Sequence, residues 1–457
     1  MKKMIDTDKL LLNAKRIHMI GIGGAGMNPI AEILHNKGYD LTGSDNNETD
    51  SLARIKSLGI PVKMGHFAEN VHGADLVVYS AAIMKDNPEL VEADRLSIPT
   101  LERSFALGAL TRQFDNCIGI CGTHGKTTVT AMTTQLFLQS GKDPSAVIGG
   151  KLPLTNCYGI SGNTDTFIVE SCEYVDTFLK LSPDTAVILN IDCDHMEYFK
   201  TLDRLKKSFT DFASTAQKVI VNGDDENTLD AVKGIKYISY GLSENCDYRA
   251  VNVQYGTKTA GEYDFYHKGE KLCHITVGVP GEHNISNSLA AAVIAYENGI
   301  TASQIEENLV KFKGAGRRFE ILGEVDGITI ADDYAHHPKE LEVTLKSALK
   351  MGYNNVYAIF QPFTYSRTSL LFDDFVNVLK LPTQTILSEI MGSREINTYN
   401  IYSKDLCEKI ENSVWFESFD EIAEYAKKIA KSGDLVITLG CGDIYKAAKI
   451  LLSKLKA

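Results

Sequence analysis

The sequence lacks an excess of positive charge. It contains 47 Lys and Arg against 59 Asp and Glu, which gives a formal net charge of −12 at pH 7. Because nucleic acids and anionic membranes repel a surface of the same sign, neither is expected as the principal partner. Long apolar runs are also missing, since no segment reaches the roughly 18 uninterrupted apolar residues typical of a membrane-spanning helix. We therefore expect neither a membrane protein nor a nucleic-acid-binding protein.

Paired cysteine motifs and an N-terminal signal are absent as well. The nine cysteines contain no C-x-x-C pair, and the first residues contain no apolar core of the signal-peptide kind. These features predict reduced thiols and a cytoplasmic protein. Low-complexity segments and short repeats are missing too, which argues against a solenoid or a disordered tail. With 457 residues, 44% of them hydrophobic, the chain is long enough for roughly two to four globular domains.

The order of apolar runs predicts an α/β protein with three domains. The first domain (1–110) and the third (317–457) alternate strands with helices, which is typical of Rossmann-like, doubly wound parallel sheets. The second domain (111–316) is predicted to be P-loop ATPase-like, with antiparallel strands at its edge over 236–278. Glycine-rich residues 314–316 indicate a hinge before the third domain. The predicted strands span residues 16–22, 40–44, 76–80, 116–120, 166–170, 186–191, 218–222, 328–331, 356–360, 385–387 and 435–439.

The most informative motif is the turn Gly-Thr-His-Gly-Lys-Thr-Thr, which follows an apolar strand and precedes a helical run. Backbone N–H groups in such a turn face an anion, Lys126 can reach terminal phosphates, and the Thr127 hydroxyl can bind Mg²⁺. The spacing is shorter than in a standard Walker motif, because Gly122 stands three residues before Gly125. A chance match in an unrelated loop is the alternative. The predicted ATP-binding residues here are Gly122, Thr123, His124, Gly125, Lys126, Thr127 and Thr128.

Two other strands end in side chains that can bind a metal. Glu170 ends one strand, and His195 follows another. Since ligands bind at the carboxyl ends of strands in open α/β sheets, these residues and Thr127 are the predicted metal ligands. Hard oxygen ligands favour Mg²⁺ over zinc, although an imidazole on Mg²⁺ is unusual. The alternative is that Glu170 and Glu173 are solvated loop acids and His195 caps a helix.

A second glycine loop, Gly21 to Gly26, fits G-x-G-x-x-G and is followed by Asp45 at the end of the next strand. Alone, this pattern suggests a nicotinamide-dependent oxidoreductase. The loop requires only a pyrophosphate at a helix N-terminus, however, and a UDP-sugar carries one too. The separate ATP-type turn favours two nucleotides used together, one as the energy source and the other as the nucleotide part of a substrate.

Several segments, taken jointly, resemble the Mur ligase family of ATP-dependent, amide-forming enzymes of peptidoglycan precursor synthesis. The resemblance runs essentially end to end and is greatest to members that join L-alanine to UDP-N-acetylmuramate. It implies that the first domain binds the UDP-sugar, the second binds Mg-ATP, and the third closes over both with the amino acid. Oligomeric state stays open between monomer and homodimer. The segments span residues 21–27, 122–128, 190–195, 281–287, 316–320, 332–338 and 360–362.

The resemblance also implies roles for individual residues. Without it, 281–287 and 336–338 would be interpreted as helix starts. The implied catalytic residues are Lys126, Asp333, His336 and Arg367. The implied ATP-binding residues outside the turn are His283, Asn284, Asn287, Arg318 and Asp333. The implied substrate-binding residues are Gly23, Gly24, Ala25, Gly26, Ser44, Asp45, Ser80, Glu173, Tyr334 and His336.

The implied reaction begins with attack of the lactyl carboxylate on the γ-phosphate of ATP, and the amine of L-alanine then displaces phosphate from the acyl phosphate. His336 or Asp333 is the candidate base. One departure from the pattern is Phe363, where the alanine ligases commonly carry His. Three alternatives stay open: a murein peptide-recycling ligase, which usually has Phe where this chain has Tyr334, a nicotinamide-dependent oxidoreductase, and a non-catalytic nucleotide-binding regulator.

Overall fold

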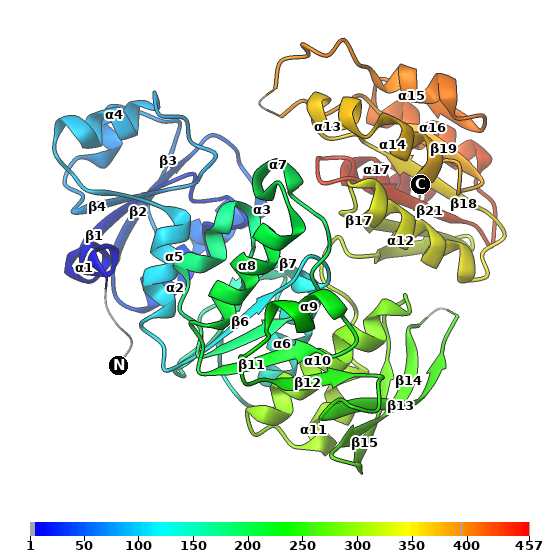
Figure 1. The fold of residues 1–457 in the computed structure, drawn as a ribbon. Helices are drawn as coiled ribbons and strands as arrows, with labels where there is room; N and C mark the ends of the chain where they lie inside the picture. The colour runs from blue at the N-terminus through cyan, green and yellow to red at the C-terminus, as the bar shows by residue number, and fades with distance from the viewer. Residues whose placement is uncertain (1–4, 258, 394, 457) are drawn as a thin grey trace. The chain divides into compact units, whose positions relative to one another are not determined.

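The computed structural model describes residues 5–257, 259–393 and 395–456 (Figure 1). The chain divides into two compact units. The first contains residues up to 253 together with 262–276 and 285–312, and the second contains 254–261, 277–284 and the chain from 313 onward. Three separate sheets are present, of five, ten and six strands. The mixed α/β architecture with three sheets confirms the predicted fold class, while the domain boundaries proposed from the sequence stay a prediction.

The N-terminal sheet has the strand order β3-β2-β1-β4-β5, and all its pairs are parallel. The predicted strands are present, and β3 and β5 are additional short edge strands. Successive residues face opposite sides, so Met19 and Ile20 belong to different buried clusters and helices cover both faces. The strands are β1 (Arg16–Ile20), β2 (Asp40–Asp45), β3 (Val62–Met64), β4 (Leu76–Tyr79) and β5 (Thr100–Glu102). The helices are α1 (Asp6–Asn13), α2 (Asn28–Asn36), α3 (Asp50–Ser57), η1 (Ala68–Val71), α4 (Pro88–Arg95) and α5 (Arg103–Thr111).

The central sheet has the order β15-β14-β13-β12-β11-β10-β6-β9-β7-β8. Its middle strands are parallel, and β7–β8 is antiparallel at one edge. At the other edge two residues connect β14 to β15, and only antiparallel neighbours can be joined so closely. The predicted antiparallel edge is therefore confirmed. The strands are β6 (Asn116–Cys121), β7 (Ser145–Leu152), β8 (Cys157–Ile160), β9 (Thr166–Glu170), β10 (Thr185–Ile188), β11 (Lys218–Asn222), β12 (Ile238–Gly241), β13 (Tyr248–Tyr255), β14 (Gly261–His267) and β15 (Glu270–Val277).

Helices connect the central strands and extend beyond them. Strands β6, β9, β10 and β11 are each followed by a helix, the usual crossover of a parallel sheet, whereas β12 leads to its parallel neighbour β13 through a loop. The helices are α6 (Lys126–Gln139), η2 (Tyr174–Lys180), α7 (Met196–Phe199), α8 (Leu202–Ala213), α9 (Glu226–Ala231), α10 (His283–Glu297) and α11 (Ala302–Leu309). Among the described residues, none of the helices combines the length and apolar character needed to cross a membrane.

The C-terminal sheet has the order β16-β17-β21-β18-β19-β20, with only β16 antiparallel to its neighbour. Alternate residues supply two buried clusters, for example Ile330 and Val436 on one face and Ala331 and Ile437 on the other. Helices cover both faces, as predicted for a Rossmann-like domain (Figure 1). The strands are β16 (Glu320–Val325), β17 (Ile328–Asp333), β18 (Val356–Phe360), β19 (Gln384–Leu387), β20 (Ser413–Trp415) and β21 (Leu435–Leu439). The helices are α12 (Pro338–Lys350), α13 (Tyr365–Leu370), α14 (Phe372–Val378), α15 (Ser403–Lys409), α16 (Phe419–Ile429) and α17 (Tyr445–Lys456).

Candidate functional site

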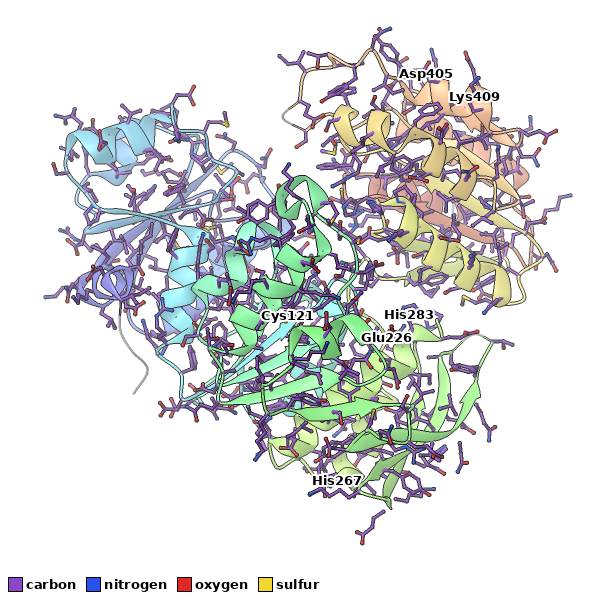
Figure 2. All side chains as sticks on the ribbon, viewed as in Figure 1. Cys121, Glu226, His267, His283, Asp405 and Lys409 are labelled. Carbon is purple, nitrogen blue, oxygen red and sulfur yellow. The ribbon has the colours of Figure 1, made fainter. Side chains whose placement is uncertain are left out.

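The predicted phosphate turn lies between β6 and α6. Strand β6 ends at Cys121, in the middle of the central sheet (Figure 2), and the helix begins at Lys126. Gly122 and Gly125 have φ angles of 141° and 86°, which L side chains rarely adopt. A Cβ atom on Gly125 would also lie 2.5 Å from Oδ1 of Asn287. Glycine is therefore required here by both backbone conformation and space, and the sequence-predicted Asn287 is placed against the turn.

Lys126 is held by oxygen atoms around its ammonium group. Nζ donates to the carbonyl oxygens of Gly122 and Thr123 and, at 3.0 Å, to Oε1 of Glu173. Both side chains are shielded, with 14% of Lys126 and 1% of Glu173 exposed. Burial alone would lower the pKa of Lys126, but the nearby Glu173 carboxylate outweighs it and raises this pKa. Lys126 therefore stays protonated across the physiological range and is a fixed cation at the turn.

Thr127 and Glu170 form the oxygen-rich part of the site. The Thr127 hydroxyl donates to Oε1 of Glu170 at 3.0 Å, and the backbone N–H of Gly149 donates to Oε2 at 2.7 Å. A Cβ atom on Gly149 would lie 2.5 Å from the Glu170 carboxylate, so only glycine leaves room for it. The sequence did not indicate Gly149, because it lies on β7, 21 residues before its partner.

The turn is also fastened to the segment that follows β10. The N–H of His124 donates to Oδ1 of Asn190, and Nδ2 of Asn190 donates back to the His124 carbonyl. The Thr123 hydroxyl similarly accepts from the N–H of Asp192 at 2.9 Å. Asn190 belongs to a segment that the sequence indicated, but its role in holding the turn was not predicted. These paired contacts fix the turn.

His195, the third predicted metal ligand, lies in the same unit. It precedes α7 with a φ of 55°, and its ring lies 4.7 Å from that of Tyr174. Among the residues that the structure describes, no three His, Cys, Asp or Glu side chains are close enough to hold a metal ion. The structure thus joins Thr127 and Glu170, whereas the assignment of His195 as a third ligand stays a prediction.

The N-terminal glycine loop is held by the end of β2. The N–H groups of Gly21 and Ile22 donate to the Ser44 carbonyl at 2.8 and 3.2 Å, and the N–H of Gly23 donates to Oδ2 of Asp45 at 2.9 Å. The Ser44 hydroxyl is buried and donates to Glu89. The side chain of Ser44, implied as a substrate contact, therefore faces the protein interior and supports the loop.

The rest of this loop is accessible. Gly24 and Ala25 are exposed, Gly26 is half-buried, and Ser80 follows β4 at the same edge of the sheet. A Cβ atom on Gly26 would lie 3.2 to 3.3 Å from side-chain atoms of Arg103. The Arg103 side chain thus lies against the loop, which gives a loop of this kind a cation suited to a diphosphate. Sequence reasoning missed Arg103, because it lies in a helix more than 70 residues from the loop.

In the second unit, Asp333 ends β17 and is almost fully buried. Its two carboxylate oxygens accept from the N–H groups of Phe319 and Ala335 at 2.7 and 2.8 Å. Burial raises the pKa of Asp333 to about 6, and the opposing charge of Arg318 only partly offsets this. Both oxygens accept backbone hydrogen bonds, and the assignment of Asp333 as a base stays a prediction.

His336 is the other predicted base. Its ring lies edge-on to those of Tyr334 and Phe363, with centroids 5.6 and 6.5 Å away. Burial lowers the pKa of His336 below the ordinary imidazole value, although the Glu340 carboxylate acts in the opposite direction. The imidazole is therefore neutral at physiological pH and can accept a proton. The neighbouring His337 caps α12, which begins at Pro338. Of the segment 336–338, residues 337 and 338 therefore form the helix start.

Arg367 lies at the start of α13. Its positive charge adds to the effect of burial in lowering the pKa of His336, and it opposes the rise that burial causes in the pKa of Cys441. Nη1 of Arg367 is buried and has no hydrogen-bond partner among the described residues. A buried guanidinium N–H without a partner is costly, and a carboxylate is its natural ligand.

The remaining predicted ATP-binding residues lie at the start of α10 and beside Tyr334. His283 begins α10 (Figure 2), and Asn284 donates from Nδ2 to the Pro280 carbonyl at 2.6 Å. Arg318 lies over the ring of Tyr334, 5.4 Å from its centroid. These contacts fix the side chains, and the nucleotide contacts implied by the resemblance stay a prediction.

Comparison with known proteins gives three family models along the chain. They are described as the Mur ligase family catalytic domain over residues 16–115, the Mur ligase middle domain over 120–295, and the Mur ligase glutamate ligase domain over 317–442. The chain is 39% identical over 461 residues to the UDP-N-acetylmuramate–L-alanine ligase of Caldanaerobacter subterraneus subsp. tengcongensis, with 99% of each chain covered.

Solved structures of ligases also match this chain. The UDP-N-acetylmuramate-alanine ligase of Thermotoga maritima matches with a TM-score of 0.82 and 26% identity, covering 96% of this chain and 99% of that one. A murein peptide ligase from Psychrobacter arcticus matches with a TM-score of 0.74 and 23% identity, covering 96% and 98%. At that identity the second match supports the fold alone.

Proposed function

The chain belongs to the Mur ligase family, and we propose that it joins L-alanine to the lactyl carboxylate of UDP-N-acetylmuramate through an acyl phosphate. It is an ATP-dependent amide-forming ligase of peptidoglycan precursor synthesis. The observation that carries the mechanism is the turn between β6 and α6, where Glu173 holds the Lys126 ammonium and the adjacent Thr127 hydroxyl donates to Glu170. We also propose a cytoplasmic location.

In the first step the lactyl carboxylate attacks the γ-phosphorus, the bond to the β-phosphate breaks, and ADP leaves. Charge spreads over the equatorial oxygens of the transferred group, so a cation fixed beside them lowers the barrier. Lys126 meets this requirement because it is charged and already held in place. The turn's backbone N–H groups and the N-terminus of α6 orient the phosphates.

Mg²⁺ fits the oxygen ligands of this site. Such an ion is held by one or two protein ligands together with phosphate oxygens, and it neutralises charge on the phosphates. The Thr127 hydroxyl and the Glu170 carboxylate, 3.0 Å apart, would hold it. His195 is proposed as an additional ligand. Gly149 keeps the Glu170 carboxylate oriented through its N–H.

In the second step the amine of L-alanine attacks the acyl carbon and phosphate leaves. We propose that neutral His336 accepts the amine proton and that Arg367 binds the carboxylate of alanine. The buried Nη1 of Arg367, without a partner among the described residues, supports the second assignment. Tyr334 and Phe363 flank the His336 ring and would limit the space for an amino-acid side chain.

The sugar nucleotide is proposed to bind at the N-terminal glycine loop. The exposed backbone of Gly24 and Ala25 at the start of α2 suits a diphosphate, and Arg103 supplies a neighbouring positive charge. Asp45 is proposed to contact the ribose through the remaining lone pairs of its carboxylate, since its two oxygens each accept one backbone hydrogen bond, from Gly23 and Asn47.

The function is tested by phosphate release from ATP in the presence of UDP-N-acetylmuramate and one amino acid or peptide at a time. L-alanine is expected to give phosphate and the muramoyl-alanine amide in equal amounts. A preference for the recycled tripeptide would favour the murein peptide ligase. Turnover of a nicotinamide cofactor, followed by absorbance, would favour an oxidoreductase.

Replacing Glu170 with Gln is expected to raise the Mg²⁺ concentration needed for half-maximal activity. The amide removes the negative charge that attracts the ion, so the shift should be at least about tenfold. Mg²⁺ titration of ATP turnover measures it. Glu226→Gln, at an exposed glutamate in the first turn of α9 (Figure 2), is the matched control and should leave the titration unchanged. An unshifted midpoint for Glu170→Gln would remove this residue from the metal site.

Activity is expected to fall at low pH because His336 becomes protonated and can no longer accept a proton. Since burial lowers the pKa of His336, the neutral form persists below the ordinary imidazole value of about 6.5, and the decline should begin below that pH. The measurement is kcat against pH at saturating substrates. His336→Gln should be much less active and should lack this acidic limb. His274→Gln, at a half-exposed histidine of the central sheet, should keep it.

A further inference from the structure

Glu89 is a buried carboxylate that none of the proposed chemical steps uses. It lies in the first turn of α4, where its N–H donates to the capping side chain of Asn87. Its side chain is completely buried, with 0% exposed. A carboxylate removed from water to this extent is tolerated only when its oxygens accept strong hydrogen bonds. The partners of Glu89 therefore indicate what it holds in place.

Four side chains from separate parts of the N-terminal domain converge on Glu89. His18 and Asn70 contact Oε1 at 3.3 and 2.7 Å, and Ser44 and His66 contact Oε2 at 2.7 and 2.8 Å. Burial acts to raise the pKa of Glu89, but hydrogen bonds from His18, Asn70 and Ser44 outweigh it and lower the pKa. The carboxylate is therefore ionised and joins β1, β2, η1 and the loop after β3.

The contact with Ser44 connects Glu89 to the glycine loop. The Ser44 hydroxyl donates to Glu89, while its carbonyl accepts from the N–H groups of Gly21 and Ile22. The next residue, Asp45, accepts from the N–H of Gly23 through Oδ2 and from the N–H of Gly65 through its carbonyl. Displacement of the end of β2 would therefore displace the first three residues of the loop.

A second connection runs through η1. Nδ2 of Asn70 donates both to Glu89 and, at 3.2 Å, to the carbonyl of Gly65. Gly65 thus contacts the end of β2 through its N–H and the Glu89 network through its carbonyl. The loop after β3, which also carries His66, is fixed from two directions. Both the glycine loop and the loop after β3 are therefore held by the ionised carboxylate of Glu89.

We propose that Glu89 is a positioning residue for the sugar-nucleotide substrate: it supports the binding of this substrate but does not contact it. It holds the end of β2, and through it the glycine loop, in the geometry that receives the diphosphate. Binding of UDP-N-acetylmuramate then requires no ordering of the loop, which preserves affinity. This inference rests on the proposed function, because it takes that substrate as the ligand of the loop.

The test compares Glu89→Gln with the unaltered full-length protein. The amide keeps the shape of the side chain but replaces one acceptor oxygen by a donor, so it opposes the hydroxyl, amide and imidazole donors around it. We expect the Kd for UDP-N-acetylmuramate, measured by calorimetry, to rise about tenfold or more, with the Kd for Mg-ATP changed less than about twofold. In turnover assays the KM for UDP-N-acetylmuramate should rise, while kcat at saturation changes little.

Glu92→Gln is the matched control. Glu92 lies one turn further along α4 and also pairs with a histidine, His72, and with Arg95, but these partners are exposed. Its replacement should leave both dissociation constants unchanged. The comparison separates the buried network from a general effect of removing a carboxylate from this helix.

Several results would overturn the inference. Unchanged binding of UDP-N-acetylmuramate by Glu89→Gln would do so, and so would equal weakening of both nucleotides, which would indicate a general structural role. If Glu89→Gln does not fold, Asn70→Ala removes a single donor and should weaken the sugar nucleotide selectively by about threefold; no selective loss would again overturn the inference. Failure of the unaltered protein to bind UDP-N-acetylmuramate would instead refute the proposed function, and with it the premise.

Discussion

An enzyme in which Lys126 is replaced by alanine is expected to lose ATP turnover by about 10²- to 10³-fold or more, the usual consequence of removing one preorganised charge-stabilising group. The Lys126 ammonium is the fixed cation of the phosphate turn, held by Glu173 and by the carbonyl of Thr123. Its loss also leaves the buried Glu173 carboxylate without its counter-ion, directly beside the place where phosphate oxygens must enter. Both effects oppose transfer of the γ-phosphoryl group. The measurement is phosphate release at saturating ATP, L-alanine and UDP-N-acetylmuramate.

Two further variants make this result specific. Lys126→Arg keeps the charge but has a planar head that does not fit the same carbonyl contacts, so it should recover only part of the activity. Lys142→Ala, just beyond the other end of α6 and exposed, should behave like the unaltered enzyme. Near-normal phosphate release by Lys126→Ala would show that this lysine is not the cation of the transfer step. Melting temperatures of the three variants would exclude unfolding as the cause.

Replacing Arg367 with alanine is expected to weaken the use of L-alanine strongly. Losing the partner of a buried carboxylate costs about 2 to 5 kcal/mol, so the KM for L-alanine should rise by about 10²-fold. The buried Nη1 of Arg367 is available for such a ligand, because no described residue accepts its hydrogen bond. The KM values for ATP and for the sugar nucleotide should change little. Steady-state kinetics with each substrate varied in turn measure the difference.

Arg367→Lys distinguishes charge from geometry at the same position. An ammonium group keeps the positive charge but cannot donate two parallel hydrogen bonds to a carboxylate, so an intermediate KM for L-alanine is expected. Equal rises in all three KM values would instead indicate damage to the pocket as a whole. An unchanged KM for L-alanine in Arg367→Ala would place the alanine carboxylate elsewhere.

The central part of the site could be predicted because its signals are local in the sequence. Between Gly122 and Thr127, one short segment contains the glycines of the turn, the charged Lys126 and the hydroxyl that can bind a metal. The strand before this segment and the helix after it are visible as apolar runs. Glu170 was identifiable because it ends a strand, and the carboxyl ends of parallel strands share one edge of the sheet. The alternation of strands and helices predicted both Rossmann-like sheets.

The supporting contacts could not be predicted, because they join residues far apart in the chain. Gly149, Asn190 and Arg103 act on neighbours that only the folded sheet brings to them. Nothing in the local sequence distinguishes Gly149 and Arg103 from ordinary strand and helix residues, and Asn190, although it lies in an indicated segment, gives no sign of its partner. Glu89 resembles an ordinary first-turn glutamate of a helix, and only its complete burial reveals the network around it. Periodicity predicts which face of an element is buried, but not which polar groups meet there.

The pairing of Lys126 with the nearly inaccessible Glu173 also bears on how the site could be blocked. An inhibitor that imitates only adenosine leaves this ammonium–carboxylate pair untouched and gains no attraction from it. A compound with an anionic group at the γ-phosphate position must compete with Glu173 for the same lysine, as ATP does. Selective competitors of this enzyme should therefore be sought among acidic molecules, and their potency should decline as added salt screens that attraction.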